Sequence, residues 1–301
     1  MLEQQFALDR AYNTPATDYR RIAVAPLSGA CGAEIRGVDL AGTLDDATVA
    51  EVRRALLDHL VVFFREQALT PARLAALARR FGELHVHPFA EGMAEHPEIL
   101  VVRKAKTDRF NFGGEWHADV TWSETPPLGS ILYAERVPAW GGDTLFANQY
   151  MAYDALSEGM QRMLSGLRAV HSAARVYAPT GYYAADEYQR MGGTQVRPSE
   201  QARREYVHPV VRTHPETGRR CLFVNASYTE RFEGMTREES RPLLEYLFEH
   251  AVRAAFTCRF RWQTGSVAFW DNRCVLHNAI NDYPGEERLL YRATVIGERP
   301  A

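Results

Sequence analysis

The sequence has few cysteines, no excess of basic residues and no long apolar stretch. Four cysteines occur in 301 residues, and they lie far apart in the chain, at Cys31, Cys221, Cys258 and Cys274. No pair has the close spacing of a disulfide framework or a zinc knuckle, which argues against both. We therefore expect reduced and mostly buried thiols in a cytoplasmic protein.

The charges are nearly balanced, with 35 lysines and arginines against 38 aspartates and glutamates, for a net charge of −3. This balance argues against nucleic acid or an anionic membrane as a partner. No apolar run approaches the length of a transmembrane helix. Residues 1–6 carry glutamate and glutamine where a signal peptide needs basic residues, and no apolar segment follows them.

The chain has the composition of a soluble globular protein, with 46% hydrophobic and 24% charged residues. At this length it can bury a large core within one barrel-type domain. We find no repeat, low-complexity tract or linker. We expect a loose leader over residues 1–20 and a single domain over residues 21–301.

Helix starts are marked at three places. Asp45 and Asp46 precede an amphipathic pattern, and Thr70 is followed by a proline at the first helical position. Thr236 and Glu239 have the spacing of a capping box ahead of apolar positions at helical intervals. These patterns predict helices that begin near residues 46, 71 and 237.

Strand patterns occupy much of the remaining chain. Residues 60–64 form a short apolar run, and residues 256–262 and 288–295 alternate with period two. The Gly-rich segment from residue 29 to residue 40 favours a small strand pair. Few helices and many short strands predict a mainly β fold with flanking helices, a jelly roll in which a double-stranded β-helix forms the core.

His117 and Asp119 are the first candidate metal ligands. If they lie on a strand, their side chains leave on the same face and can converge on one point. With His277, they would supply two imidazoles and one carboxylate, a set that leaves positions open on non-heme Fe(II) for a cosubstrate and oxygen. Zinc accepts the same three ligands plus water, and a His-x-Asp tripeptide alone is more often a surface turn.

Arg288 and Arg292 lie on one face of a predicted strand, about 13 Å apart. Two guanidinium groups on an otherwise apolar strand are costly unless they meet solvent or anions. They follow His277 by 11 and 15 residues, with a turn over residues 281–285 between. A returning strand would bring Arg288 near the metal cavity, where it could hold a dicarboxylate in a bidentate pair.

From about Arg21 to Pro300 the sequence resembles the Fe(II)/2-oxoglutarate-dependent dioxygenases of the taurine dioxygenase (TauD/TfdA) type. The motifs that carry this resemblance occur in the family's order and spacing. They are Phe81–Pro88, Trp116–Val120, Gly141–Thr144, His208–Pro215 and Trp270–Arg273, followed by His277 and by Arg288 through Arg292.

The resemblance implies that His117, Asp119 and His277 bind Fe(II). It implies that Thr144 and Arg288 bind the distal carboxylate of 2-oxoglutarate, with Arg292 nearer the metal, at the other carboxylate or at an anionic group of the substrate. The expected reaction uses O2, decarboxylates 2-oxoglutarate to succinate and CO2, and hydroxylates an unactivated C–H bond; some members desaturate or epoxidise. Halogenation is disfavoured because Asp119 occupies the position that related halogenases leave to chloride.

The resemblance also bears on the substrate. A tyrosine and an asparagine of the family's sulfonate pocket are replaced by Ala90 and Gly113, which disfavours taurine and indicates a larger, more apolar pocket. Aryloxyalkanoates, sulfate-ester-like acids and terpenoid-type acids of specialised metabolism remain open. The expected pocket residues are His87, Phe89, Ala90, Gly113, Val120, Tyr177, Phe223, Asn225, Tyr228 and Arg292. Five of them could equally belong to the core, namely Phe89, Tyr177, Phe223, Asn225 and Tyr228.

Residues 178–206 are polar and aromatic without clear periodicity, as many lids are. We expect them to close over a small-molecule substrate, and we expect a homo-oligomer, a dimer or tetramer, as is common in the family. A zinc hydrolase and a non-catalytic binding protein are the alternatives. The Thr144 and Arg288 pair argues against the hydrolase, which needs no second dicarboxylate.

Overall fold

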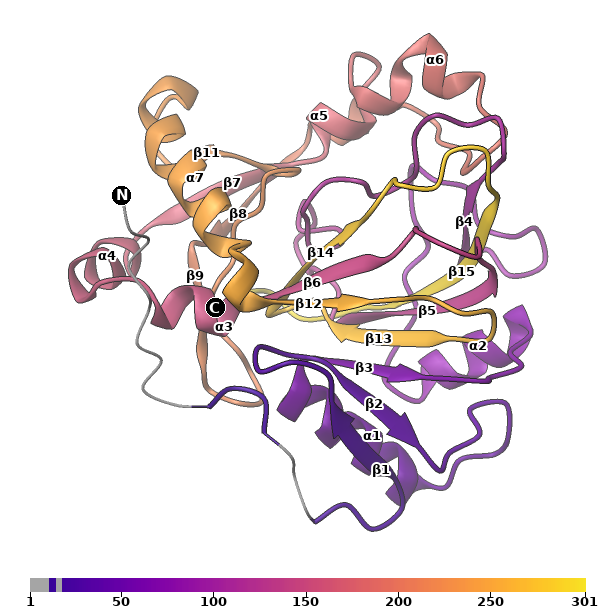
Figure 1. The fold of residues 1–301 in the computed structure, drawn as a ribbon. Helices are drawn as coiled ribbons and strands as arrows, with labels where there is room; N and C mark the ends of the chain where they lie inside the picture. Colours follow the sequence, from indigo (N-terminus) through magenta and orange to yellow (C-terminus); the bar gives the residue numbers. More distant parts are fainter. Residues whose placement is uncertain (1–10, 15–17) are drawn as a thin grey trace.

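The computed structural model describes residues 11–14 and 18–301, and within them the largest sheet has seven strands (Figure 1). All neighbouring strands of this sheet are antiparallel except β2 and β3, which run parallel. In spatial order the strands are β1 (Ala23–Pro26), β2 (Ala33–Arg36), β3 (Val61–Phe64), β13 (Val267–Asp271), β5 (Gly129–Arg136), β15 (Arg288–Val295) and β4 (Ile99–Lys104).

Smaller antiparallel sheets complete the β structure of the described ranges. One contains β12 (Thr257–Phe260), β6 (Thr144–Asn148) and β14 (Val275–Ala279), and it lies over the large sheet (Figure 1). Another contains β11 (Thr229–Phe232), β7 (Arg168–Ser172) and β8 (Glu205–Pro209), and the last pairs β10 (Arg220–Leu222) with β9 (Val211–Thr213).

The helices lie around this β core. The α-helices of the described residues are α1 (Asp46–His59), α2 (Pro71–Arg79), α3 (Gln149–Asp154), α4 (Glu158–Leu164), α5 (Ala174–Tyr177), α6 (Asp186–Gln189) and α7 (Arg237–Ala251). Short 3-10 turns are η1 (Tyr182–Ala184), η2 (Glu200–Arg203) and η3 (Ala254–Phe256). Among these residues, none of the helices combines the length and the apolar character needed to span a bilayer.

The three predicted helix starts are confirmed, and each is capped by the expected side chain. Asp45 accepts a hydrogen bond from the N–H of Thr48 at the start of α1, and Thr70 caps α2 ahead of its proline. Thr236 and Glu239 form both hydrogen bonds of the capping box on α7. These starts are predictable because each depends on contacts within one helical turn.

Among the described residues, two hydrophobic cores hold the layers together. Helices α1 and α2 bury their apolar faces against the outer side of the large sheet, where Leu56 and Leu74 pack with Val62 and Phe64. The second core lies between the facing sheets and includes Phe63, which stacks on Phe260 with ring centroids 4.0 Å apart. The site described below sits at the edge of this second core, where the two sheets face each other.

Parts of the expected leader and first strands differ from the prediction. Residues 1–10 and 15–17 lie outside the described residues, but Asn13 is buried and donates to the carbonyl oxygens of Ser28 and Gly32. The strand pair is β1 with β2, so it begins at Ala23, and Gly29 lies in the connection between the strands. The prediction started this pair too late because it followed the glycines, which mark the turn.

The prediction of few helices also missed α3 and α4. Each is short and is capped by a polar side chain, Asn148 for α3 and Ser157 for α4. Their brief lengths give little periodicity from which to predict a helix. The fold class is otherwise as expected at the coarse level, mainly β in several sheets with helices around them, and all four cysteines, which lie within the described residues, are free and buried.

Candidate active site

His117 and His277 are joined by hydrogen bonds between their backbones. The N–H of each donates to the carbonyl oxygen of the other, at 3.1 and 2.8 Å, in an isolated antiparallel bridge. His277 lies on β14, but the His117 segment is not the strand that we predicted, because a turn begins at Asp119 and Val120 has a φ of 52°. The two side chains of the His-x-Asp motif converge nevertheless.

The three predicted ligand side chains form one compact, buried group. Their ligand atoms lie within 4.8 Å of one another, and Oδ1 of Asp119 is 3.7 Å from Nε2 of His117 and 4.0 Å from Nε2 of His277. Nδ1 of His117 donates to the carbonyl oxygen of Glu115 at 2.7 Å, so its Nε2 presents a lone pair to the group. Burial lowers the pKa of both imidazoles, which keeps them neutral and able to bind a metal.

Asp119 is ionised and held at both carboxylate oxygens. Burial acts to raise its pKa, but the charge of Arg292 and the hydrogen bond from Ser130 bring that pKa below its usual range. Ser130 donates to Oδ2 at 2.8 Å, and Nη1 of Arg292 donates to Oδ1 at 2.7 Å. The carboxylate is therefore fixed with Oδ1 toward the imidazoles.

The donor set fits a divalent transition metal. Two neutral imidazole nitrogens and one carboxylate oxygen on one side of a point are typical of mononuclear non-heme Fe(II) sites. The side of this group that faces away from the three ligands is open, since His117 lines two adjoining cavities. A metal held by these three ligands would keep positions open to small molecules.

The inner cavity has the features of an anion site. It has a volume of about 30 Å³, and its lining includes Thr144 on β6, His277 on β14 and Arg288 on β15. Arg288 is 3% exposed, and its Nε and Nη2 make no hydrogen bond of good geometry among the described residues, although the Tyr283 side chain lies close enough to act on its pKa. Burial lowers its pKa, yet a guanidinium remains charged, so two unsatisfied buried donors next to Thr144 favour a bound carboxylate.

The outer cavity has a volume of about 280 Å³, and its walls combine aromatic side chains with polar and charged ones. It shares Phe112, Gly113, His117 and Arg292 with the inner cavity, so a molecule spanning both would lie against the His–Asp–His group. Its wall also contains the following side chains: His87, Phe110, Glu115, Asp119, Val120, Arg175, Tyr177, Tyr182, Tyr183, Ser227 and Tyr228.

His87 offers a hydrogen-bond donor to this cavity. Its Nδ1 accepts from the backbone N–H groups of Phe89 and Ala90, at 3.1 and 2.9 Å. Its proton is therefore on Nε2, and burial lowers its pKa well below the usual value, so it stays neutral. A neutral N–H donor beside the Arg292 cation can bind one oxygen of an acidic group.

Four residues expected in the pocket are placed elsewhere, since among the described residues they line neither cavity. Phe89 is buried behind the wall against Trp122 and Tyr177, and Ala90 forms a bridge with Val196. Phe223 packs on His171 and His208. Asn225 donates to Thr121 and caps the turn before Tyr228, so it supports the wall from outside.

The structure adds pocket residues that the motifs do not reveal. Tyr183 is buried, stacks on Phe112 with centroids 5.3 Å apart, and accepts a hydrogen bond from the N–H of Gly113 at 3.2 Å. Arg175 pairs with Glu115 at the cavity wall. The adjacent aromatics of residues 182 and 183, within the segment predicted to be a lid, were the available signal in the sequence.

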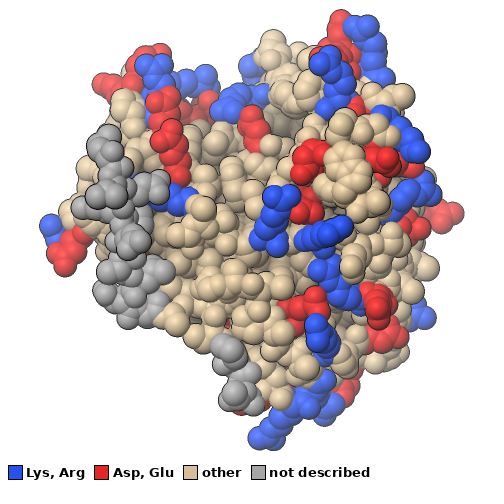
Figure 2. Space-filling model, viewed as in Figure 1, with Lys and Arg blue, Asp and Glu red and all other residues tan. Residues whose placement is uncertain are grey.

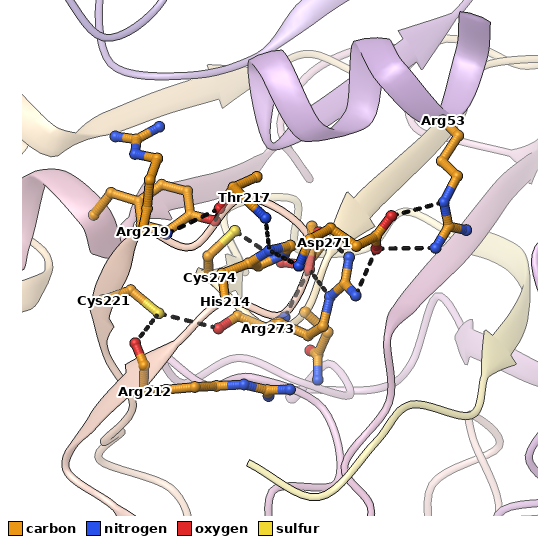
Figure 3. A network of polar contacts seen from close by, with 12 residues as sticks. Arg53, Arg212, His214, Thr217, Arg219, Cys221, Asp271, Arg273 and Cys274 are labelled. Carbon is orange, nitrogen blue, oxygen red and sulfur yellow. Dashed lines mark hydrogen bonds and ion pairs between the residues drawn. The ribbon is translucent and has the colours of Figure 1, made fainter. Parts of the chain in front are cut away.

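A second cluster, His214, Asp271 and Cys274, also has metal-ligand residue types, but its polar atoms are already paired (Figure 3). Arg273 donates to both carboxylate oxygens of Asp271, and His214 donates to the same carboxylate through Nε2. Nδ1 of His214 accepts two backbone N–H groups. Burial raises the pKa of the Cys274 thiol, so the cluster is a structural network rather than a metal site.

The site geometry agrees with comparisons to known proteins. The model of the taurine catabolism dioxygenase TauD, TfdA family matches residues 23–294. The chain belongs to this family of dioxygenases.

Its relatives share most of its length. The chain is 36% identical to an alpha-ketoglutarate-dependent sulfate ester dioxygenase of Pseudomonas putida, over 92% of this chain and 90% of that one. It is 33% identical to the alpha-ketoglutarate-dependent 2,4-dichlorophenoxyacetate dioxygenase of Cupriavidus pinatubonensis, over 91% and 97% of the two chains. A crystal structure of a taurine dioxygenase from Burkholderia xenovorans matches with a TM-score of 0.78 and 40% identity, over 94% and 91%.

Proposed function

We propose that this chain uses Fe(II), 2-oxoglutarate and O2 to oxidise an unactivated C–H bond of a small organic acid, with 2-oxoglutarate decarboxylated to succinate and CO2. The observation that carries the proposal is the pair of buried Arg288 donors, unsatisfied among the described residues, beside the His117, Asp119 and His277 group. A zinc hydrolase would use the three ligands but would have no use for a second buried anion site. Family membership likewise favours the oxygenase over a binding protein.

Each part of the site has a defined task in this proposal. His117, Asp119 and His277 would hold Fe(II), which supplies the redox chemistry that couples O2 to decarboxylation and C–H oxidation. Arg288 and Thr144 would bind and orient the distal carboxylate of 2-oxoglutarate. Trp262 donates to Oγ1 of Thr144 at 2.9 Å, which leaves the hydroxyl proton of Thr144 free to turn toward a carboxylate.

The facing sheets give this site a rigid frame. Thr144 and His277 come from the small sheet, and Arg288 and Arg292 come from the large one. We propose that these two sheets are the halves of a double-stranded β-helix, the jelly-roll core expected from the sequence. A single domain over residues 21–301 is part of the same proposal.

The substrate is proposed to enter the outer cavity with its acidic group toward Arg292 and His87. The aromatic side chains of this cavity, which include Phe112, Tyr177 and Tyr183, suit an apolar body. Aryloxyalkanoates and sulfate-ester-like acids fit this description, as do terpenoid-type acids. Hydroxylation beside an ether or ester oxygen gives a product that collapses, so the net reaction would be cleavage.

The metal and cosubstrate are tested by anaerobic spectroscopy. Fe(II) and 2-oxoglutarate added together to the protein should produce a visible metal-to-ligand charge-transfer band. His117→Ala should lose this band, whereas His96→Ala, which removes a histidine that lines neither cavity, should keep it. No band with the wild type, or an unchanged band in His117→Ala, would contradict the proposal.

The substrate class is tested by measuring succinate release over a panel. Sulfonates including taurine, sulfate esters, aryloxyalkanoates and terpenoid acids should be compared at equal concentration. We expect the aromatic or larger apolar acids to give more succinate than taurine does. Taurine as the best substrate would contradict the proposed pocket.

Partners and location remain predictions. Figure 2 shows acidic and basic side chains interspersed over one face of the molecule, which suits an enzyme of small molecules better than a nucleic-acid-binding surface. We propose a cytoplasmic enzyme that forms a dimer or tetramer. Cell fractionation and size-exclusion chromatography with light scattering would test these two points.

A further inference from the structure

The backbone of Asp119 is hydrogen-bonded to a side chain instead of to a neighbouring strand. At His117 the chain makes a two-way backbone bridge with His277. Two residues later the N–H of Asp119 donates to Oδ1 of Asn272 at 2.7 Å, and Nδ2 of Asn272 donates to the carbonyl oxygen of Asp119 at 2.8 Å. The amide of Asn272 thus supplies the pair of hydrogen bonds that a neighbouring strand would give.

Asn272 is itself held firmly. It is 1% exposed, lies in the tight connection between β13 and β14, and its own N–H donates to the carbonyl oxygen of Leu128 at 2.9 Å. Nδ2 also reaches the carbonyl oxygen of Pro127 at 3.4 Å. A side chain anchored in this way can fix the position of another segment, because its own rotamer is restricted by packing and hydrogen bonds.

The Asp119 segment needs such an anchor. Val120 follows directly, and its φ of 52° places a β-branched residue in the left-handed region. That conformation is unfavourable for a β-branched residue and persists where neighbouring contacts enforce it. Ser130 fixes Oδ2 of Asp119 from β5, so the residue is held at its backbone by Asn272 and at its carboxylate by Ser130.

We propose that Asn272 is a positioning residue for the metal centre. It does not bind the metal, and it acts by holding the backbone of Asp119 so that Oδ1 stays directed at the two imidazoles. This inference rests on the proposed function, since it concerns the metal site of that function. Partners outside the ligand set that orient ligands commonly contribute 10- to 100-fold to metal affinity.

The test is Mn(II) binding by calorimetry to the metal-free protein, with Mn(II) in place of Fe(II) because it resists oxidation. Asn272→Ala removes both hydrogen bonds, and Asn272→Asp keeps the shape but replaces the donor to the Asp119 carbonyl by an oxygen. We expect both variants to bind Mn(II) about 10- to 100-fold more weakly than the wild type. Near-ultraviolet circular dichroism should show that the variant used is folded, and Asn272→Asp serves if Asn272→Ala does not fold.

Asn148→Ala is the matched control. Asn148 is also a fully buried asparagine with bonds to backbone groups, namely the carbonyl oxygen of Ala30 and the N–H groups of Tyr150 and Met151. We expect this variant to lose stability while keeping its Mn(II) affinity. Equal losses of affinity in the Asn148 and Asn272 variants would mean that general destabilisation is the cause, and the proposal would fail.

The same titrations distinguish a failure of the proposed metal site from a failure of the positioning role of Asn272. If the wild type does not bind Mn(II), or if His277→Ala binds it as well as the wild type does, the metal site itself is wrong. If the wild type binds through His277 and a folded Asn272 variant binds within twofold of it, only the positioning role is overturned.

Discussion

Arg292 donates through Nη1 to Oδ1 of Asp119 at 2.7 Å, and this oxygen is the one nearest the Nε2 atoms of His117 and His277. The guanidinium therefore binds the carboxylate oxygen that a metal would use. Nε of Arg292 is buried without a partner among the described residues. A bound metal would compete with Arg292 for Oδ1 and release the guanidinium toward the cavity, where it could meet an anion.

Arg292→Met should separate the stabilising effect of the ion pair with Asp119 from its competition with a metal. Without metal, the variant leaves a buried carboxylate unpaired, so we expect its unfolding free energy to fall by about 3–5 kcal/mol. Mn(II) should then bind as tightly as in the wild type or more tightly, because a competing positive charge is gone. Thermal unfolding with and without Mn(II) measures both effects, and weaker Mn(II) binding would contradict this account.

Arg288→Met should act on the cosubstrate alone. The KM for 2-oxoglutarate should rise by about 100-fold, because a buried charged hydrogen-bond pair is worth roughly 3 kcal/mol. The metal-free variant should be at least as stable as the wild type, since it no longer buries donors that lack a partner within the described part of the chain. We expect 2-oxoglutarate to raise the melting temperature of the wild type but not that of the variant. A retained rise would show that the cosubstrate binds elsewhere.

Gly113→Ala should disturb His117. Gly113 has a φ of +77°, and a Cβ added there would lie 3.3 Å from Cε1 of the His117 ring. Gly218→Ala is the matched control, because its φ is +67° but a Cβ meets nothing within 4 Å. Both variants should lose about 1–2 kcal/mol of stability from the left-handed backbone. Weaker Mn(II) binding is expected only for Gly113→Ala, and equal affinities in the two variants would contradict the prediction.

Tyr183→Phe should loosen residues 178–206 over the outer cavity. The change keeps the stacking on Phe112 but leaves the N–H of Gly113 without its acceptor, at a cost of about 1–3 kcal/mol. Tyr188→Phe, the control, removes a hydrogen bond to Thr194 within the same segment. We expect a higher substrate KM for the Tyr183 variant than for the Tyr188 variant.

The lid itself is tested by hydrogen exchange. If residues 178–206 close over the substrate, their amides should exchange more slowly when substrate, Mn(II) and 2-oxoglutarate are bound. Equal protection with and without substrate would rule the lid out.

Acidification should destabilise the protein through buried histidines such as His208. Burial lowers the pKa of His208 to about 4, and Nε2 donates to the carbonyl oxygen of Ser123. Its unfolded pKa is about 6.5, so the folded state binds fewer protons between these values. The contribution of His208 to stability should be constant above pH 6.5 and fall toward pH 4, with about 3 kcal/mol as its upper limit. Urea unfolding of His208→Gln should show a shallower pH dependence, and an unchanged slope would contradict the assignment.

Local contacts explain why some features were predictable from the sequence. The caps of α1, α2 and α7 depend on residues within one turn, so a short window of sequence is sufficient. Because a short window of sequence does not include distant partners, the strand predicted at His117 and Asp119 was wrong. The convergence of their side chains was predicted from a strand, whereas the structure achieves it with one bridge, a turn at Val120 and the distant Asn272.

The sequence by itself determined the ligand types, the candidate arginines and the family, because these depend on residue identity and order. Only the tertiary structure decided which carboxylate oxygen faces the imidazoles, which donors of Arg288 lack partners, and that Tyr183 rather than Phe89 lines the outer cavity. These features arise from packing between elements far apart in the chain. The periodicity of one segment shows that a side chain is buried, but it cannot show which distant element covers it.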